Sequence, residues 1–285
     1  MATVTKKTVL ITGCTTGGIG WAMAKVFHSR GYYVFATVRG GQASKAEGLT
    51  ELGDVEILDV DVTDTDTISR AKDVVAKRTG GRLDVLMNNA GAEFVCPLLD
   101  TDIAEAKKLF DVNLWGPLAM VQAFAPLLVA AQGIISNHTS IASVLPLVWA
   151  GAYSAAKSAE LRFSEILRCE MQPLGVRVVT AMVGSVDTPI FNKPGGKMQL
   201  PETSYYYRIA EKAYQQRLDH QKESMQVGPF AEQLVADILD SNQPTVWRGT
   251  AAAMTKFALW AFPKWYLEKL CNGDRGLELV KKPST

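Results

Sequence analysis

Residues 8–31 read TVLITGCTTGGIGWAMAKVFHSRG, and this stretch decides the fold. An apolar run, Thr8–Thr12, leads into a glycine-rich segment and then into a helical pattern, Trp21–Arg30, which ends at Gly31. A β-branched run followed by a tight turn and a helix begins a βαβ unit. Glycines in that turn leave backbone N–H groups uncovered at the start of the helix, where phosphate binds. The stretch favours dinucleotide binding over a purely structural turn.

Beyond this stretch, short apolar runs alternate with longer helical patterns. The apolar runs are Tyr33–Thr37, Glu56–Val60, Val85–Met87, Gly133–Ile135 and Arg177–Met182. The helical patterns are Asp66–Thr79, Asp102–Ala131, Tyr153–Gln172 and Ala231–Leu239. Such alternation is typical of βαβ units around a buried parallel sheet. We therefore expect an α/β fold in which one sheet domain fills most of the chain.

The composition excludes several classes of protein. The chain has 285 residues, 47% hydrophobic and 21% charged, which excludes intrinsic disorder for most of its length. Lys and Arg number 30 against 29 Asp and Glu, without a dense basic run, so no nucleic acid partner is expected. The four cysteines and three histidines lack disulfide or ligand spacing, which predicts no metal and a reducing compartment. Because we see neither a signal peptide nor a run of roughly 18 to 20 apolar residues, we expect a cytoplasmic protein.

Two segments depart from the alternating pattern. Residues 189–228 mix Pro, Gly and three consecutive tyrosines, Tyr205–Tyr207, which favours a substrate lid over a solvated excursion. In the carboxyl-terminal extension, residues 251–285, aromatic residues such as Phe257 and Trp260 recur at helical intervals between lysines. A helix that lies on a membrane surface is built in this way. The same apolar side is equally suited to cover the protein's own pocket or a subunit interface.

The ends of the second and third predicted strands bear on the choice of dinucleotide. NAD-selective sites place Asp or Glu after the second strand, whereas this chain has Arg39 near that point. Arg39 either pairs with the 2′-phosphate of NADP(H) or is a solvated loop arginine. After the third strand, Asp61 is suited to accept a hydrogen bond from the adenine amino group. Alternatively, Asp59 or Asp61 caps the helix that starts near Asp66.

Three further side chains point to proton transfer. Tyr153 and Lys157 stand four residues apart in a helical pattern, so they project from one helix face. A phenol with its ordinary pKa of about 10 carries protons poorly at neutral pH, but a neighbouring ammonium favours the phenolate. Ser140, after the fifth predicted strand, is suited to hold a carbonyl oxygen. An isolated Tyr/Lys pair is more often a surface pair, so the assignment depends on the other motifs.

Five motifs in register resemble those of a known family. They are the glycine loop, the Asn-Asn-Ala-Gly segment 88–91, Asn113 in FDVNLWG, Ser140, and the Tyr153/Lys157 pair. Over about residues 6–250 the chain resembles the short-chain dehydrogenase/reductase family. Within that family, the stretches TGCTTGGIG, LPETSYY and VWRGTAAAMTKFALWAFPKWYLEKL are similar to fungal reductases of the 1-acyldihydroxyacetone-phosphate type.

The resemblance implies a fold and a set of roles. Residues 1–250 would form a single-domain Rossmann fold, a doubly wound parallel sheet of about seven strands with helices on both faces. Tyr153 would be the general acid and base, and Ser140 would polarise the carbonyl. Lys157 would bind the nicotinamide ribose and lower the pKa of Tyr153, and Asn113 would hold a water in the proton relay. The residues implied in binding NADPH or NADP+ are Gly13, Thr15, Thr16, Gly18, Ile19, Gly20, Arg39, Asp61, Val62, Asn89, Ala90, Gly91, Tyr153, Lys157, Val186 and Thr188.

Two departures from the family pattern matter. The glycine loop is one residue longer than usual, which leaves open whether Thr15 or Thr16 touches the adenosine ribose. Val183 replaces the usual proline after the sixth predicted strand, while Val186 and Thr188 keep the positions that hold the nicotinamide carboxamide.

The resulting expectation is an NADPH-dependent carbonyl reductase acting on a hydrophobic ketone or alcohol, similar to an acyl-dihydroxyacetone phosphate. The alternatives are a fungal ketoreductase of polyketide or terpenoid metabolism and a nucleotide-binding protein without catalysis. The resemblance also implies a homodimer or homotetramer through the helices around 102–131 and 153–172. It further suggests peripheral attachment to the endoplasmic reticulum or to lipid droplets through the carboxyl-terminal segment.

Overall fold

Seven parallel strands form the central sheet of the computed structural model, which describes residues 4–40, 43–192, 198 and 200–280. The sheet order is β3-β2-β1-β4-β5-β6-β9. The strands β1 and β4 are parallel, and the direction in which successive strands are added to the sheet reverses between them, as in a doubly wound Rossmann fold. The strands are β1 (Thr8–Ile11), β2 (Tyr33–Val38), β3 (Val55–Asp59), β4 (Val85–Asn88), β5 (Ile134–Ser140), β6 (Arg177–Val183) and β9 (Thr245–Arg248). The predicted fold class is confirmed. The six apolar runs foreseen from the sequence are all strands, whereas β9 was not foreseen because TVWR is short and half polar.

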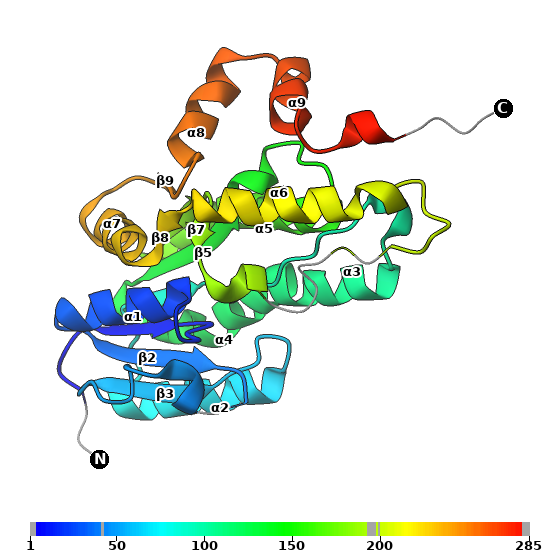
Figure 1. Cartoon of the computed structure of the whole chain (residues 1–285). Helices are drawn as coiled ribbons and strands as arrows, with labels where there is room; N and C mark the ends of the chain where they lie inside the picture. Colours follow the sequence, from blue (N-terminus) through cyan, green and yellow to red (C-terminus); the bar gives the residue numbers. More distant parts are fainter. Residues whose placement is uncertain (1–3, 41–42, 193–197, 199, 281–285) are drawn as a thin grey trace.

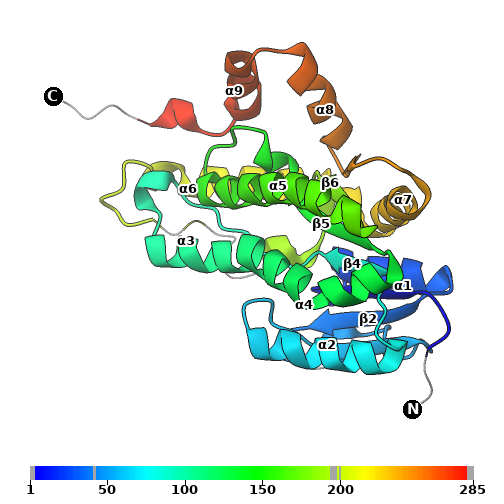
Figure 2. The same ribbon diagram turned by 180° about the vertical axis from the view of Figure 1, so that it is seen from behind.

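Helices cover both faces of the sheet. The helices α1 (Ile19–Ser29) and α7 (Val227–Asp240) pack on one face, as Figure 1 shows. Figure 2, from behind, shows the other face, covered by α2 (Thr65–Thr79), α4 (Gly116–Ala131) and α5 (Gly151–Met171). Successive strand residues serve opposite faces, since Val9 and Ile11 join the first core and Leu10 joins the second. This two-sided burial explains why strands such as β1 and β2 are almost entirely apolar in sequence.

The helical pattern 102–131 is one apolar rod with a defect. It consists of α3 (Ile103–Phe110), a π-helical turn η3 (Asp111–Trp115) and α4. By length and composition, the helical segment Ile103–Ala131 is long and apolar enough to cross a membrane. From the sequence we expected no apolar run of that length. One side of α4 is nevertheless core, where Met120, Val121 and Phe124 are buried beneath the sheet. The π turn adds a residue to one helical turn and so re-aims the side chains within it.

The segment 189–228 contains secondary structure of its own. It begins with η6 (Pro189–Asn192) and continues through η7 (Tyr207–Ile209) to α6 (Ala210–Lys222). The flanking short strands β7 (Val186–Asp187) and β8 (Met225–Gln226) pair with each other in parallel. The remaining short 3-10 turns are η1 (Ala43–Ala46), η2 (Leu98–Asp100), η4 (Ile141–Ser143), η5 (Gln172–Leu174) and η8 (Leu277–Leu279).

The carboxyl-terminal helices α8 (Ala252–Ala261) and α9 (Lys264–Asn272) project at one end of the molecule (Figures 1 and 2). They are joined to the loop that precedes α5. The side chain of Asn272 accepts from Val148 N at 3.0 Å and donates to the carbonyl of Pro146 at 2.7 Å, and Trp149 Nε1 donates to the carbonyl of Arg275 at 3.0 Å. The extension is therefore anchored beside the segment that separates Ser140 from Tyr153.

Candidate active site

The glycine loop presents an uncovered helix terminus. Helix α1 starts at Ile19, its N-cap Gly18 offers no side-chain acceptor, and its first turn carries no acid. Gly13 has a φ of +74°, which favours glycine. A Cβ on Gly20 would lie 2.6 Å from Asn89 Nδ2 and from the Gly13 carbonyl. These positions keep backbone N–H groups open toward the loop, so the residues present fit the phosphates of a dinucleotide.

The two threonines of the lengthened loop differ in their contacts. Thr16 Oγ1 donates to the carbonyl of Lys45 at 3.1 Å and accepts from Glu47 N at 2.9 Å. Its hydroxyl therefore ties the glycine loop to the segment after β2. Thr15 is exposed, and among the described residues its hydroxyl has no hydrogen-bond partner, which leaves it available to a ligand.

Two cations stand at the end of β2. Arg39 is exposed there, and Lys45 Nζ donates to the Arg39 carbonyl at 2.8 Å. The nearest strand-end carboxylate, Asp59, is already engaged, because its Oδ1 accepts from Gly40 N at 2.7 Å. The sequence reading missed Lys45, whose place depends on how the segment after Arg39 folds back on the glycine loop.

The aspartates after β3 serve the local backbone. Asp61 Oδ1 accepts from Thr63 N at 3.0 Å and from Thr63 Oγ1 at 2.7 Å. The N-cap of α2 is Asp64, whose carboxylate accepts from the N–H two residues later. The alternative that Asp59 or Asp61 caps this helix is therefore wrong. Val62 is buried in the core against the first turn of α4.

The Asn-Asn-Ala-Gly segment ties the end of β4 to the end of β1. The backbone N–H groups of Asn89 and Ala90 both donate to Thr12 Oγ1 at 2.9 Å, and Asn89 Nδ2 donates to the Thr12 carbonyl at 2.8 Å. Gly91 follows, where a Cβ would lie 3.3 Å from Asn113 Oδ1. These contacts hold the glycine loop and the catalytic candidates within one scaffold.

Asn113 lies in the π turn and is fully buried. Its Oδ1 accepts from Ala92 N and its Nδ2 donates to the Ala92 carbonyl, both at 2.8 Å. The side chain thus clamps the backbone that follows Gly91. The sequence pattern foresaw the residue, but not the helical defect that turns it inward.

Tyr153 and Ser140 meet where β5 ends and α5 begins. Burial raises the pKa of Tyr153, while the charge of Lys157 and a hydrogen bond with the Ser140 side chain act to lower it. Ser140 Oγ also accepts from Ala142 N at 3.2 Å, which fixes the serine at the start of η4. A hydroxyl pair in this position is able to bind a carbonyl oxygen and to supply it with a proton.

Lys157 has a partner that the sequence reading missed. Its Nζ donates to the His138 carbonyl at 2.8 Å and to Glu160 Oε2 at 2.7 Å. Glu160 raises the pKa of Lys157, although burial acts in the opposite direction. The available signal was the spacing, because Glu160 lies three residues after Lys157 and hence on the same helix face.

Val186 and Thr188 lie beside the glycine loop, at the start of the predicted lid. Val186 is buried in β7 and Thr188 is buried after it. A Cβ on Gly17 would lie 3.2 Å from the ring of Pro189, the first residue of η6. The predicted lid therefore begins against the loop that fits the phosphates.

Apolar side chains of the lid meet the loop before α5. Trp149 packs edge-on against Tyr206 with ring centroids 5.2 Å apart, and Met198 and Ile209 are buried in the same cluster. Of the three consecutive tyrosines, Tyr206 packs in this way, whereas its two neighbours are exposed. An anionic substrate calls for cations beside the pocket, and the segment 189–228 offers Lys193, Lys197 and Arg208. Arg208 is exposed, whereas Lys193 and Lys197 lie outside the described residues.

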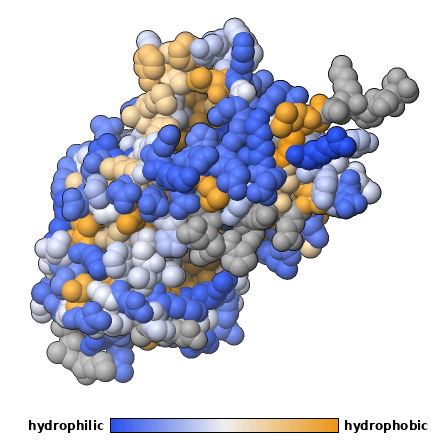
Figure 3. Space-filling view, in the orientation of Figure 1, coloured by the Kyte–Doolittle hydropathy of each residue, from blue (hydrophilic) through white to orange (hydrophobic). Residues whose placement is uncertain are grey.

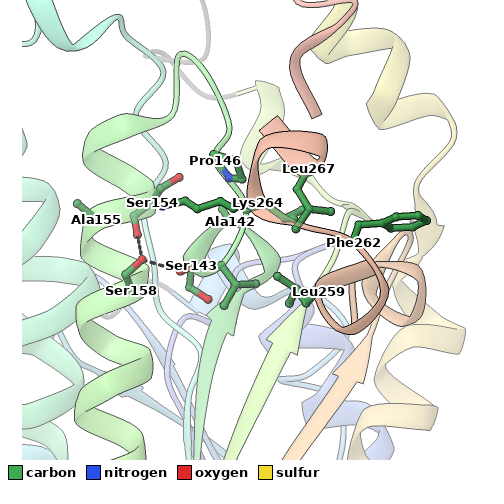
Figure 4. Close-up of a pocket in the computed structure, with 12 residues that line it drawn as sticks. Ala142, Ser143, Pro146, Ser154, Ala155, Ser158, Leu259, Phe262, Lys264 and Leu267 are labelled. Atoms are coloured by element: carbon green, nitrogen blue, oxygen red, sulfur yellow. Dashed lines mark hydrogen bonds between the residues drawn. The ribbon is translucent and has the colours of Figure 1, made fainter. Parts of the chain in front are cut away.

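A groove of about 440 Å³ lies outside this site (Figure 4). It runs between the outer side of α5, lined by Ser154 and Ser158, and the α8–α9 pair, lined by Leu259, Phe262 and Leu267. Neither Ser140 nor the Tyr/Lys pair lines it. The groove is therefore separate from the candidate proton-transfer centre.

The family model described as short chain dehydrogenase matches residues 7–198. The chain belongs to the short-chain dehydrogenase family. Short-chain dehydrogenase cctT of Talaromyces islandicus is 42% identical over 96% of this chain and 97% of its own length. An NADPH-dependent 1-acyldihydroxyacetone phosphate reductase of Schizosaccharomyces pombe is 43% identical over 71% of this chain and 68% of its own.

Solved structures agree with this assignment. A short-chain dehydrogenase from Streptomyces avermitilis has a TM-score of 0.77 at 25% identity and covers 96% of this chain and 98% of its own. A second, from Burkholderia cenocepacia in complex with NADP, has a TM-score of 0.73 at 26% identity and covers 95% and 99%. The expected family and the expectation of an oxidoreductase are confirmed.

Proposed function

We propose that this short-chain dehydrogenase is an NADPH-dependent carbonyl reductase. The observation that carries the proposal is the Tyr153 hydroxyl, which hydrogen-bonds with the Ser140 side chain and interacts with the charge of Lys157, together with a glycine loop that fits a dinucleotide. When bound, the nicotinamide cofactor supplies the hydride that the carbonyl carbon accepts. Ser140 holds the carbonyl oxygen, and Tyr153 donates its proton to that oxygen as the alcohol forms. Lys157 then stabilises the phenolate that remains.

NADPH is favoured over NADH by charge. Arg39 and Lys45 stand at the end of β2, and the strand-end Asp59 is occupied by a backbone N–H. Cations at this point pair with a 2′-phosphate, whereas a free carboxylate would pair with a ribose 2′-hydroxyl. The NADP complex of the Burkholderia relative and the NADPH dependence of the Schizosaccharomyces relative support the same choice.

The substrate we propose is a hydrophobic ketone. The cluster of Trp149, Met198, Tyr206 and Ile209 places apolar surface between the lid and the loop that follows Ser140. An acyl-dihydroxyacetone phosphate is one such ketone, by analogy with the Schizosaccharomyces relative. A ketone of fungal secondary metabolism is the second candidate, in keeping with the fungal short-chain dehydrogenases that match nearly the whole chain.

A steady-state assay of NADPH oxidation across both ketone classes tests the proposal. We expect turnover by the wild type and a loss of at least a thousandfold for Tyr153→Phe, with NADPH binding retained by fluorescence. Full turnover by Tyr153→Phe would refute the assigned proton donor. NADPH binding without turnover of any ketone would instead favour the non-catalytic nucleotide-binding alternative. Arg39→Ala is expected to lower the preference for NADPH over NADH.

We also propose that the α8–α9 pair attaches the enzyme to a membrane surface. Trp260 is 84% exposed, and Met254, Phe257, Trp265 and Leu270 are exposed with it. Figure 3 shows hydrophobic surface gathered at this end of the molecule. Lysines at 256, 264 and 269 flank these side chains, which suits anionic headgroups. A peripheral position on the endoplasmic reticulum or lipid droplets would bring the active site to a lipid-borne ketone.

Co-sedimentation with vesicles tests this attachment. The double variant Phe257→Ser/Trp260→Ser is compared with Leu98→Ser/Leu99→Ser, which removes two equally exposed apolar residues of η2. A truncation before β9 would be a poor test, because it would remove a strand of the sheet. We expect only the α8 variant to lose binding to vesicles with 30% anionic lipid, with its activity on a soluble ketone unchanged. Equal sedimentation of both variants would refute the attachment.

We propose that the chain forms a homodimer or homotetramer. Its support is the exposure of Ile103, Trp115 and Ile166 on α3, η3 and α5, which gives the helices around the site apolar outer surfaces. Light scattering after size exclusion tests it, and a monomer at micromolar concentration would refute it.

A further inference from the structure

A buried carboxylate sits directly behind the catalytic lysine. The side chains of Lys157 and Glu160 are 7% and 1% exposed, and the ammonium and carboxylate are 2.7 Å apart. Acidic side chains are almost never fully buried unless they are paired. Lys157 is the only cation that pairs with Glu160 in the described part of the chain.

The position of Glu160 follows from the inward stripe of α5. The buried residues of this helix recur at three- and four-residue steps and include Ala156, Lys157, Glu160, Ser164 and Leu167. Glu160 thus occupies a core position one turn beyond the lysine, where an apolar residue would ordinarily pack. Burying a carboxylate costs desolvation energy, whereas burying an apolar residue does not. Packing alone therefore does not explain why Glu160 occupies this position.

The geometry of the ammonium suggests that reason. Two of its three protons are donated inside the protein, one to the His138 carbonyl and one to Glu160. These two fixed bonds, from β5 and from α5, leave one donor for a ligand. A Cβ on Gly91 would lie 3.9 Å from the Nζ, so the ammonium borders the segment that follows β4.

We propose that Glu160 is a positioning residue, whose carboxylate keeps the Lys157 ammonium charged and held in place beside the Tyr153 hydroxyl. This inference rests on the proposed function for its effect on catalysis, but not for its effect on the lysine. Without the carboxylate, the buried ammonium has only a carbonyl to compensate its desolvation, and it gives up its proton more readily. The positive field that favours the Tyr153 phenolate would then weaken in the pH range where alcohol oxidation needs a base. The charge of Glu160 itself raises the pKa of Tyr153, so its removal alone would lower that pKa, and an upward shift therefore reports loss of the Lys157 charge.

The other titratable groups around this pair are few. Tyr153 lies on the same helix, His138 on β5 and Glu93 in the loop after β4, and each interacts electrostatically with the cluster. Asp111 of η3 is exposed. None of these groups is changed in the variants below. A difference in titration between the variants and the wild type therefore reports the effect of the Glu160 carboxylate.

Glu160→Gln keeps the shape and removes the charge, and Glu165→Gln on the same helix is the matched control. Glu165 pairs with Arg162 at the partly exposed side of α5. The rate of alcohol oxidation rises with pH as Tyr153 ionises. We expect this rising limb of the pH profile to shift to higher pH by at least one unit in Glu160→Gln, and not in Glu165→Gln. That shift is a tenfold loss of rate at pH 7, with recovery at high pH. Glu160→Asp, which keeps the charge, should move the limb less.

A measurement independent of turnover separates this inference from the proposed function. In protein labelled with 13C-lysine, the ε-carbon signal of Lys157, assigned by its absence in Lys157→Arg, reports the protonation of the ammonium. We expect the signal to titrate at least one unit lower in Glu160→Gln than in the wild type. An unchanged titration, or a downward shift of the oxidation limb, would overturn the proposal. If Glu160→Gln does not fold, the same comparison is made with Glu160→Met, which also removes the charge at this core position.

Discussion

His138 makes the fold sensitive to acid, and its replacement isolates the effect. The residue lies on β5 with 6% of its surface exposed, and neither ring nitrogen has a hydrogen-bond partner in the described part of the chain. Burial, together with the charge of Lys157, lowers the pKa of His138 from 6.5 to about 3. The imidazole is therefore neutral in the folded protein at any pH where the enzyme works.

The magnitude follows from linkage. Below pH 6.5 the unfolded chain gains a proton at this histidine that the folded chain does not accept, so stability falls as pH falls toward 3. Each pH unit corresponds to about 1.4 kcal/mol, so the loss is about 2 kcal/mol at pH 5 and about 3 kcal/mol at pH 4. His138→Leu has a similar volume and no proton to gain. The free energy of unfolding of the variant should therefore rise by these amounts relative to the wild type.

The difference between variant and wild type is needed because Glu160 acts in the opposite direction. Burial raises the pKa of Glu160, although the charge of Lys157 acts to lower it. A group with a raised pKa stabilises the fold below its unfolded value, and that contribution is lost as pH rises through its folded pKa. The wild-type curve alone mixes the two effects, whereas Glu160 is common to both proteins and cancels in the difference.

Urea unfolding at pH 7.5, 6, 5 and 4, at one protein concentration, measures this difference. Altered packing in His138→Leu would change the free energy of unfolding by the same amount at every pH. The prediction concerns only how the difference between variant and wild type changes with pH. His220→Gln, at a half-exposed position, controls for the removal of a histidine. If the His138→Leu and wild-type curves run parallel from pH 7.5 to 4, the argument from burial fails.

Three other predictions test the site and its frame. Gly20→Ala should weaken NADPH binding at least tenfold by fluorescence, because a Cβ there meets neighbouring atoms at 2.6 Å, whereas Gly53→Ala, with nothing within 4 Å, should not. Asn113→Ala should lower the free energy of unfolding by about 2 kcal/mol, since it leaves the N–H and the carbonyl of half-buried Ala92 without their hydrogen-bond partner; an unchanged urea midpoint would contradict this. Burial raises the pKa of Cys14 to about 12, so maleimide should label exposed Cys169 first by mass spectrometry, and early labelling of Cys14 would show that its thiol is accessible.

The fold and the main members of the site were predictable because their signals are local. A strand, a glycine turn and a helix follow one another within residues 8–31, and the Tyr153/Lys157 spacing follows from helix geometry. The strands β1, β2 and β4 are buried on both faces, which leaves an apolar run in the sequence. The strand β9 has four residues and a weaker run, and its pairing with β6 is a contact between distant segments.

The contacts of individual side chains required the tertiary structure. The hydroxyl of Thr16 is occupied by the segment after β2, Asp64 caps α2, and the π turn points Asn113 inward. Each of these contacts depends on which segment of the folded chain lies within hydrogen-bond distance of the side chain. A sequence motif does not distinguish between residues of the same type in this respect. The sequence offered no rule that chooses between two adjacent threonines or among nearby aspartates.

The sequence by itself determined the α/β fold, the family and the positions of the family's motifs along the chain, because hydrophobic periodicity and motif spacing are properties of neighbouring residues. Only the tertiary structure decided the environment of each ionisable group. Burial and pairing set the charge of His138, Lys157 and Glu160, and both depend on segments far apart in the chain. Lys157 was identifiable from its sequence motif. The role of Glu160 was not, because it depends on the burial of the carboxylate and on its 2.7 Å contact with the Lys157 ammonium.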